Sequence, residues 1–365
     1  MSKFLATVFL CLWAGSLSAD VLQTSAGPVQ VSKVAEGLDT PWAVGILPDG
    51  SFLVTERDGD LLYVSKGKAR RVKGAPKVAA NGQGGLLDVT VAKNFQRTRE
   101  IFLTFSKPQK GGAGTALAVA RLSESGDRLT NLRVIFEAVP GGSGGRHFGS
   151  RVVEAPDGKL FVTIGDRGDR PQAQNRSNHM GTVIRINRDG TVPANNPFVG
   201  QSDIRPEIWS YGHRNPQGAG LDGRGNLWLS EHGARGGDEV NRIKPGANYG
   251  WPVISYGVHY SGDKIGEGTS KPGMEQPEHY WDPSIAPSGL MVYSGKLWPE
   301  WRGNLFVGSL KFDYIARLSG SNLREVEQIK GPETERVRDI VEAPDGSIWF
   351  ISVGQGAIYR MVPAS

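Results

Sequence analysis

Cysteine is almost absent from this chain of 365 residues. The only one, Cys11, lies within residues 1–19, which have the layout of a secretory signal: a positive charge at Lys3, an apolar stretch and a cleavage site of small residues. We therefore expect residues 1–19 to be removed and the protein to be periplasmic or secreted. The mature protein, residues 20–365, would then hold no disulfide and must gain its stability from a large packed core.

Long apolar runs, helical periodicity and nucleic-acid patterns are also lacking. The N-terminal apolar stretch is about a dozen residues long, which is too short to span a membrane. The net charge is +5, yet no basic run is interleaved with aromatic residues, so nucleic acid is not an expected partner. The positive balance is compatible with an anionic ligand or an anionic partner.

Several common catalytic patterns do not occur. All histidines lie between His147 and His279, with no His-x-x-x-His pair and no cysteine cluster, which argues against a zinc site. There is no G-x-S-x-G elbow and no phosphate-binding P-loop. No G-x-G-x-x-G follows a strand and opens a helix, so NAD is not an expected cofactor.

Glycine, in contrast, is abundant, with 50 residues beside 22 prolines. Without a collagen period, this content indicates many tight turns. One unit recurs: a turn containing Asp-Gly or Gly-Asn, a β-branched strand, a polar turn and a second strand. The copies are PDGSFLVTERDGDLLYV from Pro48, REIFLTF from Arg99, PDGKLFVTIGD from Pro156, DGRGNLWLSEHG from Asp222, RGNLFVGSLKFDYIARL from Arg302 and PDGSIWFISVGQGAIYRM from Pro344.

Six such units predict an all-β, six-bladed β-propeller, because one unit cannot bury both of its faces and six arranged radially can. A β-sandwich or a different number of blades is the alternative. The strand that starts at Pro28, PVQVSKVAEGL, is expected to pair with the last blade and close the ring. We expect a single domain over residues 20–365 with a long irregular insertion around 246–287, and a connection of that length usually has a function.

Two glycine-rich segments could bring the backbone close to a ligand: NGQGGLLDV around Gln83 and GGSGGRHFGSR around His147. His147 opens a strand on the face where propeller ligands bind, although a lone histidine is more often structural. The segment SYGHRNPQG holds Arg214 and Asn215 in a turn, where two fixed polar side chains suit a carboxylate or a quinone oxygen. Turn capping is the plainer interpretation of that pair, and His213 beside it is a second candidate base.

Later segments offer oxygen ligands and positive charge. DEVNRIKPGANYGWP contains Glu239 and backbone oxygens near Tyr249, which suit calcium, although acidic loop residues are usually only solvated. Lys311, Arg336 and Arg338 add positive charge at the edges of two later blades. Two residues two positions apart in a strand face the same side, so both arginines could point inward.

Taken in order, these segments resemble the soluble aldose sugar dehydrogenases that depend on pyrroloquinoline quinone (PQQ), the relatives of soluble glucose dehydrogenase. The matching pieces are PWAVGILPDG, GQGGLLDV, HFGSR, GDRGD, YGHRNPQG, SEHG…GDEVNRIKPGANYGWP, APSGL and RVRDI, over nearly the whole mature chain. YGHRNPQG and GANYGWP are specific, whereas many propellers share the PDG repeats. The resemblance implies a six-bladed propeller with PQQ and calcium at its centre.

The resemblance also implies roles for individual residues. His147 would be the general base, and the cofactor contacts would be Gln83, His147, Arg214, Asn215, Tyr260, Lys311, Arg336 and Arg338. The backbone carbonyls of Gly233 and Ala234 would hold the calcium beside the cofactor, and Glu239 and Tyr249 match a second, structural calcium site. Two departures from the soluble glucose enzyme stand out. Gly233-Ala234 replaces its Gly-Pro, and Arg146 replaces the Asp before its histidine, which puts glucose as the substrate in doubt.

The implied reaction is oxidation of an aldose at C1 to a lactone. Neutral His147 would take the proton of the C1 hydroxyl, the hydride would pass to the quinone, and the electrons would leave to an external acceptor. Two rivals remain: a calcium-dependent propeller lactonase and a non-catalytic ligand-binding propeller. The fold does not choose among them, because propellers host all three. The sequence is compatible with a monomer or a homodimer.

Overall fold

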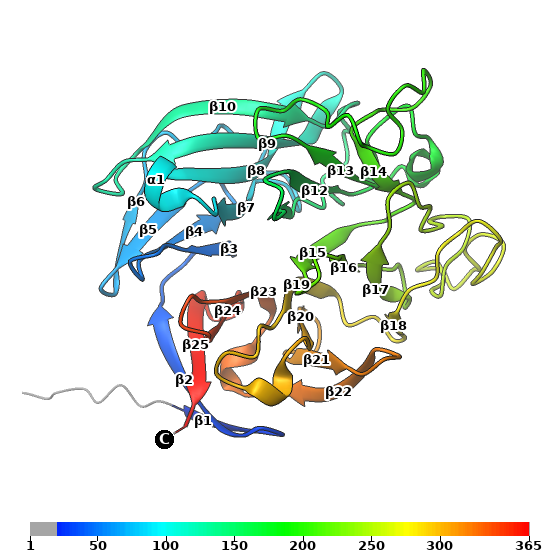
Figure 1. Cartoon of the computed structure of the whole chain (residues 1–365). Helices are drawn as coiled ribbons and strands as arrows, with labels where there is room; N and C mark the ends of the chain where they lie inside the picture. The colour runs from blue at the N-terminus through cyan, green and yellow to red at the C-terminus, as the bar shows by residue number, and fades with distance from the viewer. Residues whose placement is uncertain (1–19, 365) are drawn as a thin grey trace, which may run out of the picture.

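The structure, a computed structural model, describes residues 20–364. The expected secretory signal at residues 1–19 lies outside the described residues, so the signal and the location drawn from it stay predictions. Within the described range the strands form six antiparallel sheets around a central axis (Figure 1). The chain is therefore an all-β, six-bladed β-propeller, which confirms the prediction from the repeats.

The first three blades follow one another along the chain. Blade 1 contains β3 (Pro41–Ile46), β4 (Phe52–Glu56), β5 (Leu61–Ser65) and β6 (Lys68–Arg71). Blade 2 contains β7 (Leu86–Val91), the short helix α1 (Phe95–Thr98), β8 (Glu100–Gln109), β9 (Gly112–Leu122) and β10 (Leu129–Glu137). Blade 3 contains β11 (Val152–Glu154), β12 (Leu160–Ile164), the 3-10 turn η1 (Arg170–Gln174), β13 (Thr182–Ile186) and β14 (Ile208–Tyr211).

The last three blades complete the ring. Blade 4 contains β15 (Pro216–Leu221), β16 (Leu227–Glu231), β17 (Asp238–Ile243) and β18 (His279–Trp281). Blade 5 contains β19 (Pro287–Val292), η2 (Pro299–Trp301), β20 (Leu305–Ser309), β21 (Ile315–Ser319) and β22 (Arg324–Ile329). Blade 6 contains β23 (Val337–Glu342), β24 (Ile348–Ser352) and β25 (Ala357–Pro363), joined by β2 (Gly27–Ala35) and β1 (Asp20–Thr24), and η3 (Pro332–Thr334) precedes it.

The repeated turns form because their aspartates bond the backbone two residues further on. The Asp49 carboxylate accepts the N–H of Ser51 at 3.0 Å, and Asp345 accepts that of Ser347 at 2.9 Å. Gly50 takes a φ of +83°, which other residues rarely adopt. The strand that follows each turn packs between neighbouring blades, and the strands β12 and β24 are buried over their whole length.

The ring is closed by strands from the two ends of the described chain. β2 pairs antiparallel with β25, and Val31 lies opposite Met361. Figure 1 shows β2 and β25 side by side in the sheet of blade 6. This pairing confirms the closure predicted for the strand that starts at Pro28.

The innermost strands are irregular at the end that faces the site. In five of the six blades the first strand carries a β-bulge near its start. A bulge adds one residue to the strand and re-aims its side chain. The extra residues of blades 1, 4 and 6 are Trp42, Gln217 and Arg338, and all three line the central cavity.

The segment 246–287 contains one regular element, the short strand β18. It is fixed to blade 4 by backbone bonds between Arg235 and Val258, one in each direction and each 3.0 Å long. This attachment brings Tyr260 to the central cavity. Within residues 20–364, no helix is long and apolar enough to cross a bilayer.

Candidate functional site

A cavity of about 1050 Å³ opens at the centre of one face, and its wall draws on all six blades and on the insertion. Eight sequence-predicted residues line it: Gln83, Asn215, Gly233, Ala234, Tyr260, Lys311, Arg336 and Arg338. His147 and Arg214 lie directly behind the wall, next in sequence to Phe148 and Asn215. Glu239 and Tyr249 lie apart from the wall, at a small cavity that Arg214 also borders.

His147 is held as an oriented imidazole. Its Nδ1 lies 2.6 Å from Oδ1 of Asp166, and Oδ2 of Asp166 accepts the indole N–H of Trp251 at 2.8 Å. Because the buried carboxylate accepts a proton from Nδ1, the lone pair of Nε2 is left free. Within residues 20–364 nothing bonds Nε2, and 11% of the His147 side chain remains exposed. This is the geometry of a general base oriented by a carboxylate.

The backbone around this histidine is also fixed. The N–H of His147 donates to Oε1 of Gln83 at 2.7 Å, and the N–H of Gln83 donates to the carbonyl of Gly145 at 2.7 Å. His147 has a φ of +57°, which is uncommon for a residue other than glycine and is found more often at functional sites. Gln83 therefore positions the histidine in addition to lining the cavity.

Burial lowers the pKa of His147 below its ordinary value. The positive charges of Arg214 and Arg146 act in the same direction, and the bond to Asp166 opposes them. The imidazole is therefore neutral at neutral pH and can accept a proton.

The second candidate base, His213, is not available for this role. Its side chain is fully buried, its Nε2 lies 2.9 Å from the hydroxyl of Ser210, and its Nδ1 lies 3.0 Å from Oε1 of Glu231. The ring also stacks on Tyr249, with centroids 4.7 Å apart. Both nitrogens are engaged, one by Ser210 of blade 3 and the other by Glu231 of blade 4, so the prediction of His213 as a base was wrong.

Arg214 and Asn215 lie between the histidine and blade 4. Nη1 of Arg214 donates to the carbonyl of His232 at 3.2 Å, and its buried Nε has no partner in the described part of the chain. Oδ1 of Asn215 accepts the N–H of Gly149 at 3.1 Å. Burial lowers the pKa of Arg214 and the charge of Asp166 opposes that shift, so the guanidinium stays charged.

Lys311, Arg336 and Arg338 supply positive charge from blades 5 and 6. Arg336 donates to the carbonyl of Leu310 at 3.0 Å, and Arg338 donates to Oε1 of Gln217 at 2.7 Å. Burial, with the charges of Arg151 and Arg336, lowers the pKa of Arg338 to about 9, so it remains cationic at neutral pH. Among residues 20–364 none of the three forms an ion pair with a carboxylate, so all three charges are open to an anionic ligand.

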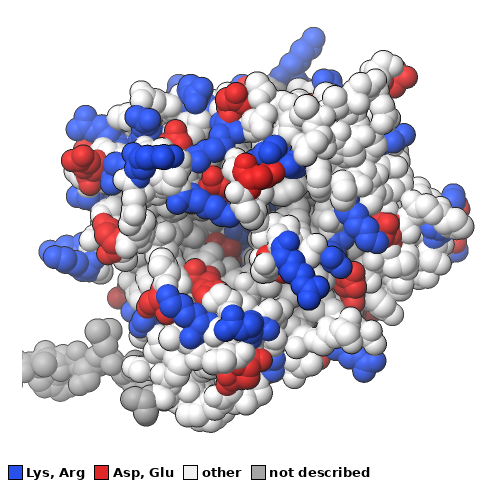
Figure 2. All heavy atoms as spheres, in the orientation of Figure 1, with Lys and Arg blue, Asp and Glu red and all other residues white. Residues whose placement is uncertain are grey.

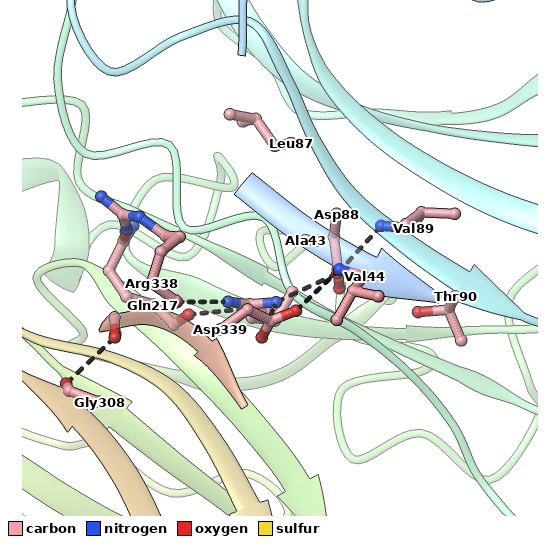
Figure 3. Close-up of polar contacts among 12 residues, drawn as sticks. Ala43, Val44, Leu87, Asp88, Val89, Thr90, Gln217, Gly308, Arg338 and Asp339 are labelled. Carbon is pink, nitrogen blue, oxygen red and sulfur yellow. Dashed lines mark hydrogen bonds and ion pairs between the residues drawn. The ribbon is translucent and has the colours of Figure 1, made fainter. Parts of the chain in front are cut away.

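A buried charge cluster lies beside Arg338 and includes its neighbour Asp339 (Figure 3). Nη1 of Arg151 lies 3.2 Å from Asp88 and 2.8 Å from Asp339, and its Nη2 donates to the carbonyl of Arg338 at 3.3 Å. The Nε of Arg151 donates to the carbonyl of Gln217 at 2.7 Å. One buried arginine therefore ties two carboxylates to the backbone of two residues in the cavity wall.

The cluster separates the central cavity from a second one. This second cavity, of about 540 Å³, is lined by Asp88, Arg151 and Asp339 together with Glu342. Figure 2 looks along the axis and shows the molecule hollowed at its centre, with Asp and Glu atoms inside the hollow and Lys and Arg around it. The cluster therefore lies between the two cavities: Leu87 and Arg338 line the central one, and their neighbours Asp88 and Asp339 line the second.

Sequence reasoning assigned no role to four residues that the structure places at the site: Arg57, Asp166, Gln217 and His232. Asp166 lies in the matched segment GDRGD and His232 in SEHG, but spacing along the chain did not show that they meet His147 or the cavity. Burial and the charges of Arg214 and Arg338 lower the pKa of His232 to about 3. Its buried Nε2 has no partner within residues 20–364.

Glu239 lies beside another acidic residue in blade 4. The amide of Asn241 donates to Glu231 at 2.9 Å and to Glu239 at 3.0 Å, while its own buried Oδ1 has no partner in the described range. Burial and the neighbouring Glu231 raise the pKa of Glu239 to about 8. The hydroxyl of Tyr249 is taken by the backbone of residues 242 and 244, so only its carbonyl could serve as a ligand.

Comparison with known proteins places the chain among sugar-oxidising enzymes. The family model for glucose / sorbosone dehydrogenase matches residues 38–360. Aldose sugar dehydrogenase YliI of Escherichia coli is 39% identical over 371 residues, covering 99% of this chain and 98% of that protein. Quinoprotein glucose dehydrogenase B of Acinetobacter calcoaceticus is 27% identical, covering 87% of this chain and 84% of that protein.

Solved structures agree with these matches. The apo form of the soluble aldose sugar dehydrogenase from Escherichia coli superposes with a TM-score of 0.89 at 39% identity, covering 92% of this chain and 100% of that one. The PQQ-bound form of aldose sugar dehydrogenase from Streptomyces coelicolor gives a TM-score of 0.76 at 25% identity, covering 91% and 97%.

Proposed function

Because the chain belongs to the glucose and sorbosone dehydrogenase family, we propose that it oxidises aldose sugars at C1 to lactones. The proposal includes PQQ as hydride acceptor, calcium beside it and an external acceptor for the electrons. The observation that carries it is the pair His147–Asp166 at the wall of a large, strongly cationic cavity. The names of the Escherichia coli and Streptomyces coelicolor relatives support the substrate class and the cofactor.

The residues at the cavity fit PQQ, a planar molecule with three carboxylates. Lys311, Arg336 and Arg338 offer positive charges that no carboxylate of the described chain neutralises. Arg214 and His232 each present a buried nitrogen without a partner, and buried polar atoms of this kind usually have one. A partly dry cavity with open cations is a favourable place for a multiply charged anion.

The chain's own residues would then divide the work. His147 takes the proton of the C1 hydroxyl through Nε2, and Asp166 holds the ring and stabilises the charge that it gains. Arg214 places positive charge where negative charge develops. When bound, PQQ would supply the quinone carbon that accepts the hydride.

Two sets of oxygen atoms fit calcium. Gly233 and Ala234, whose carbonyls would be the ligands, line the central cavity in the turn between β16 and β17. In blade 4, Glu239 and the unpartnered Oδ1 of Asn241 lie beside the carboxylate of Glu231. A cation there would bind oxygen ligands of the type that calcium prefers and would relieve the repulsion between the two carboxylates.

Two alternative functions are less well supported. A calcium-dependent lactonase needs several acidic side chains that converge on a metal, and in residues 20–364 no three His, Cys, Asp or Glu side chains do so. A purely binding propeller gives no reason for a neutral histidine that a buried carboxylate orients.

Reconstitution tests the proposal. Apoprotein should be inactive and should regain sugar-dependent dye reduction when PQQ and calcium are both added. NAD should not replace PQQ, because the chain lacks the glycine motif of a dinucleotide site. If both components give no dye reduction over a broad panel of sugars, the enzyme proposal fails.

Arg338→Lys should weaken the binding of PQQ by about tenfold, although the charge is kept. Lysine cannot reproduce the two parallel hydrogen bonds that arginine makes to a carboxylate, and a charge-assisted bond contributes about 1.5–3 kcal/mol. The measurement is titration of apoprotein with PQQ at two salt concentrations, with Lys311→Ala as a second variant. Arg360→Lys, on β25 and not among the residues that line the cavity, is the control. Unchanged affinity in both cavity variants would place the carboxylates elsewhere.

Glu239→Gln should remove most of the thermal stabilisation that calcium gives. A ligand at 100 times its Kd stabilises the native protein by about 2.7 kcal/mol. Without calcium the variant should be at least as stable as the parent, most clearly above pH 8, where Glu239 would be ionised beside Glu231. Melting curves over a calcium titration check both expectations, and parallel curves for parent and variant would count against the site.

A further inference from the structure

The central cavity carries more positive charge than its proposed cofactor needs. Its wall contains the five cationic residues Arg57, Arg235, Lys311, Arg336 and Arg338, and a single carboxylate, that of Asp282. The three carboxylates of PQQ would neutralise three of these charges, and calcium would add two more. An excess of positive charge therefore remains after the proposed cofactors are bound.

Two exposed arginines offer positive charge beyond Lys311, Arg336 and Arg338, the set proposed for the cofactor. Arg146 directly precedes His147, its side chain is exposed, and no carboxylate of residues 20–364 pairs with it. Its loop contacts the cavity wall, since the carbonyl of Gly145 accepts the N–H of Gln83. Its side chain lies against Gly168, two residues from Asp166, and its charge adds to the effects that lower the pKa of His147.

Arg235 lines the central cavity, in the turn between β16 and β17 of blade 4. Its side chain is exposed, and within the described residues it forms no ion pair. The backbone of Arg235 is held by the two hydrogen bonds to Val258, so the turn between β16 and β17 does not depend on the Arg235 side chain for its structure. By contrast, Arg57 already lies 3.1 Å from the carboxylate of Asp58.

We propose that the preferred substrate is an acidic aldose, a sugar that carries a carboxylate or phosphate away from C1, and that Arg146 and Arg235 bind this group. The inference rests on the proposed oxidation at C1. The acidic group takes no part in that chemistry: C1 loses a hydride to the quinone, the C1 hydroxyl loses its proton to His147, and a C1–O double bond forms. The two arginines act on recognition, because charge-assisted hydrogen bonds are the strong ones.

The first test compares sugars on the holoenzyme. Glucose, glucuronate and glucose 6-phosphate differ only at C6, so the ratio of their kcat/KM values reports recognition of the acid and separates carboxylate from phosphate. At low salt we expect at least one acid to exceed glucose by about a hundredfold, which is the combined worth of two charge-assisted bonds of about tenfold each. The ratio should fall as salt rises.

Variants test the residues. Arg146→Gln and Arg235→Gln should each reduce the acid-to-glucose ratio by about tenfold. Arg224→Gln, which removes an exposed charge from the turn between β15 and β16, should not change it. A readout that does not need turnover is calorimetric binding of methyl glucuronide and methyl glucoside, whose blocked C1 oxygen prevents oxidation.

The outcomes separate this inference from the proposed function. If no sugar is oxidised, the function fails, while the methyl glycosides still test the acid site. If glucose matches both acids and neither variant alters binding or kinetics, the inference is overturned. It is also overturned if the variants slow only the reoxidation by an anionic dye, because the arginines would then serve the electron acceptor.

Discussion

His147→Gln is expected to lower kcat by about 10²–10⁴-fold, the usual loss when a general base is removed. Affinity for PQQ should stay close to that of the parent, because the cationic residues of the wall remain in place. The measurement is sugar-dependent dye reduction with saturating PQQ and calcium, beside a PQQ titration of the same variant. A variant that retains the parental rate would exclude His147 as the base.

Asp166→Asn is the matched variant for this prediction. Asp166 touches no substrate in this scheme and acts through the imidazole of His147, which it orients through Nδ1. The indole N–H of Trp251 in turn holds the Asp166 carboxylate. Loss of the carboxylate removes its charge and permits the other tautomer. We expect a large fall in kcat with little change in KM. The acid limb of the pH profile should also move to lower pH, because Asp166 raises the pKa of His147. If the fall in kcat of Asp166→Asn is matched by an equal loss of folded protein and the pH profile is unchanged, Asp166 has only a structural role.

Arg151→Leu is expected to lower the free energy of unfolding by about 3–5 kcal/mol, the usual cost of removing one partner from a buried ion cluster. It would leave the carboxylates of Asp88 and Asp339 buried without their shared cation (Figure 3). Denaturant midpoints with unchanged slopes would measure the loss. Arg360→Leu, which removes a half-exposed pair with Asp345, should cost at most about 1 kcal/mol. Equal losses in the two variants would contradict the prediction.

The loss in Arg151→Leu should depend on pH. Burial already raises the pKa of Asp88 to about 6 and raises that of Asp339, while Arg151 opposes both shifts. A carboxyl whose folded pKa lies above its unfolded value costs stability as pH rises through that interval, because the folded state binds the proton more tightly. Without Arg151 both pKa values rise further. The difference between variant and parent should therefore be smaller at pH 5 than at pH 8, and a constant difference would argue against buried carboxylates as the cause.

The repeats were sufficient to predict the blades because each turn and strand is built from neighbouring residues. Asp49 and Gly50 form their turn within one short segment, so a local pattern reveals them. The closing pair β2–β25 was also predictable, since a ring of six units needs one strand to complete its last sheet.

The interior of the site was less predictable because its contacts join distant parts of the chain. Asp166 lies 19 residues after His147, and only the fold of blade 3 brings the two side chains together. Arg151, at the start of blade 3, contacts Asp88 of blade 2 and Asp339 of blade 6. The bulge at Arg338 re-aims that side chain, and no residue pattern marks a bulge of this kind. His213 shows the opposite case: its neighbour Arg214 borders the site, yet both nitrogens of His213 are taken by buried side chains of blades 3 and 4.

Closure by β2 and β25 has a consequence for folding. The two strands pair across most of the described chain, with Val31 opposite Met361, and contacts between such distant segments are slow to form. Until they form, the ring is open and each of the two strands presents an unpaired edge. Every residue that lines the central cavity precedes β25, so this last pairing adds no residue to the wall. It instead holds blade 6, and with it Arg338, in its place around the axis.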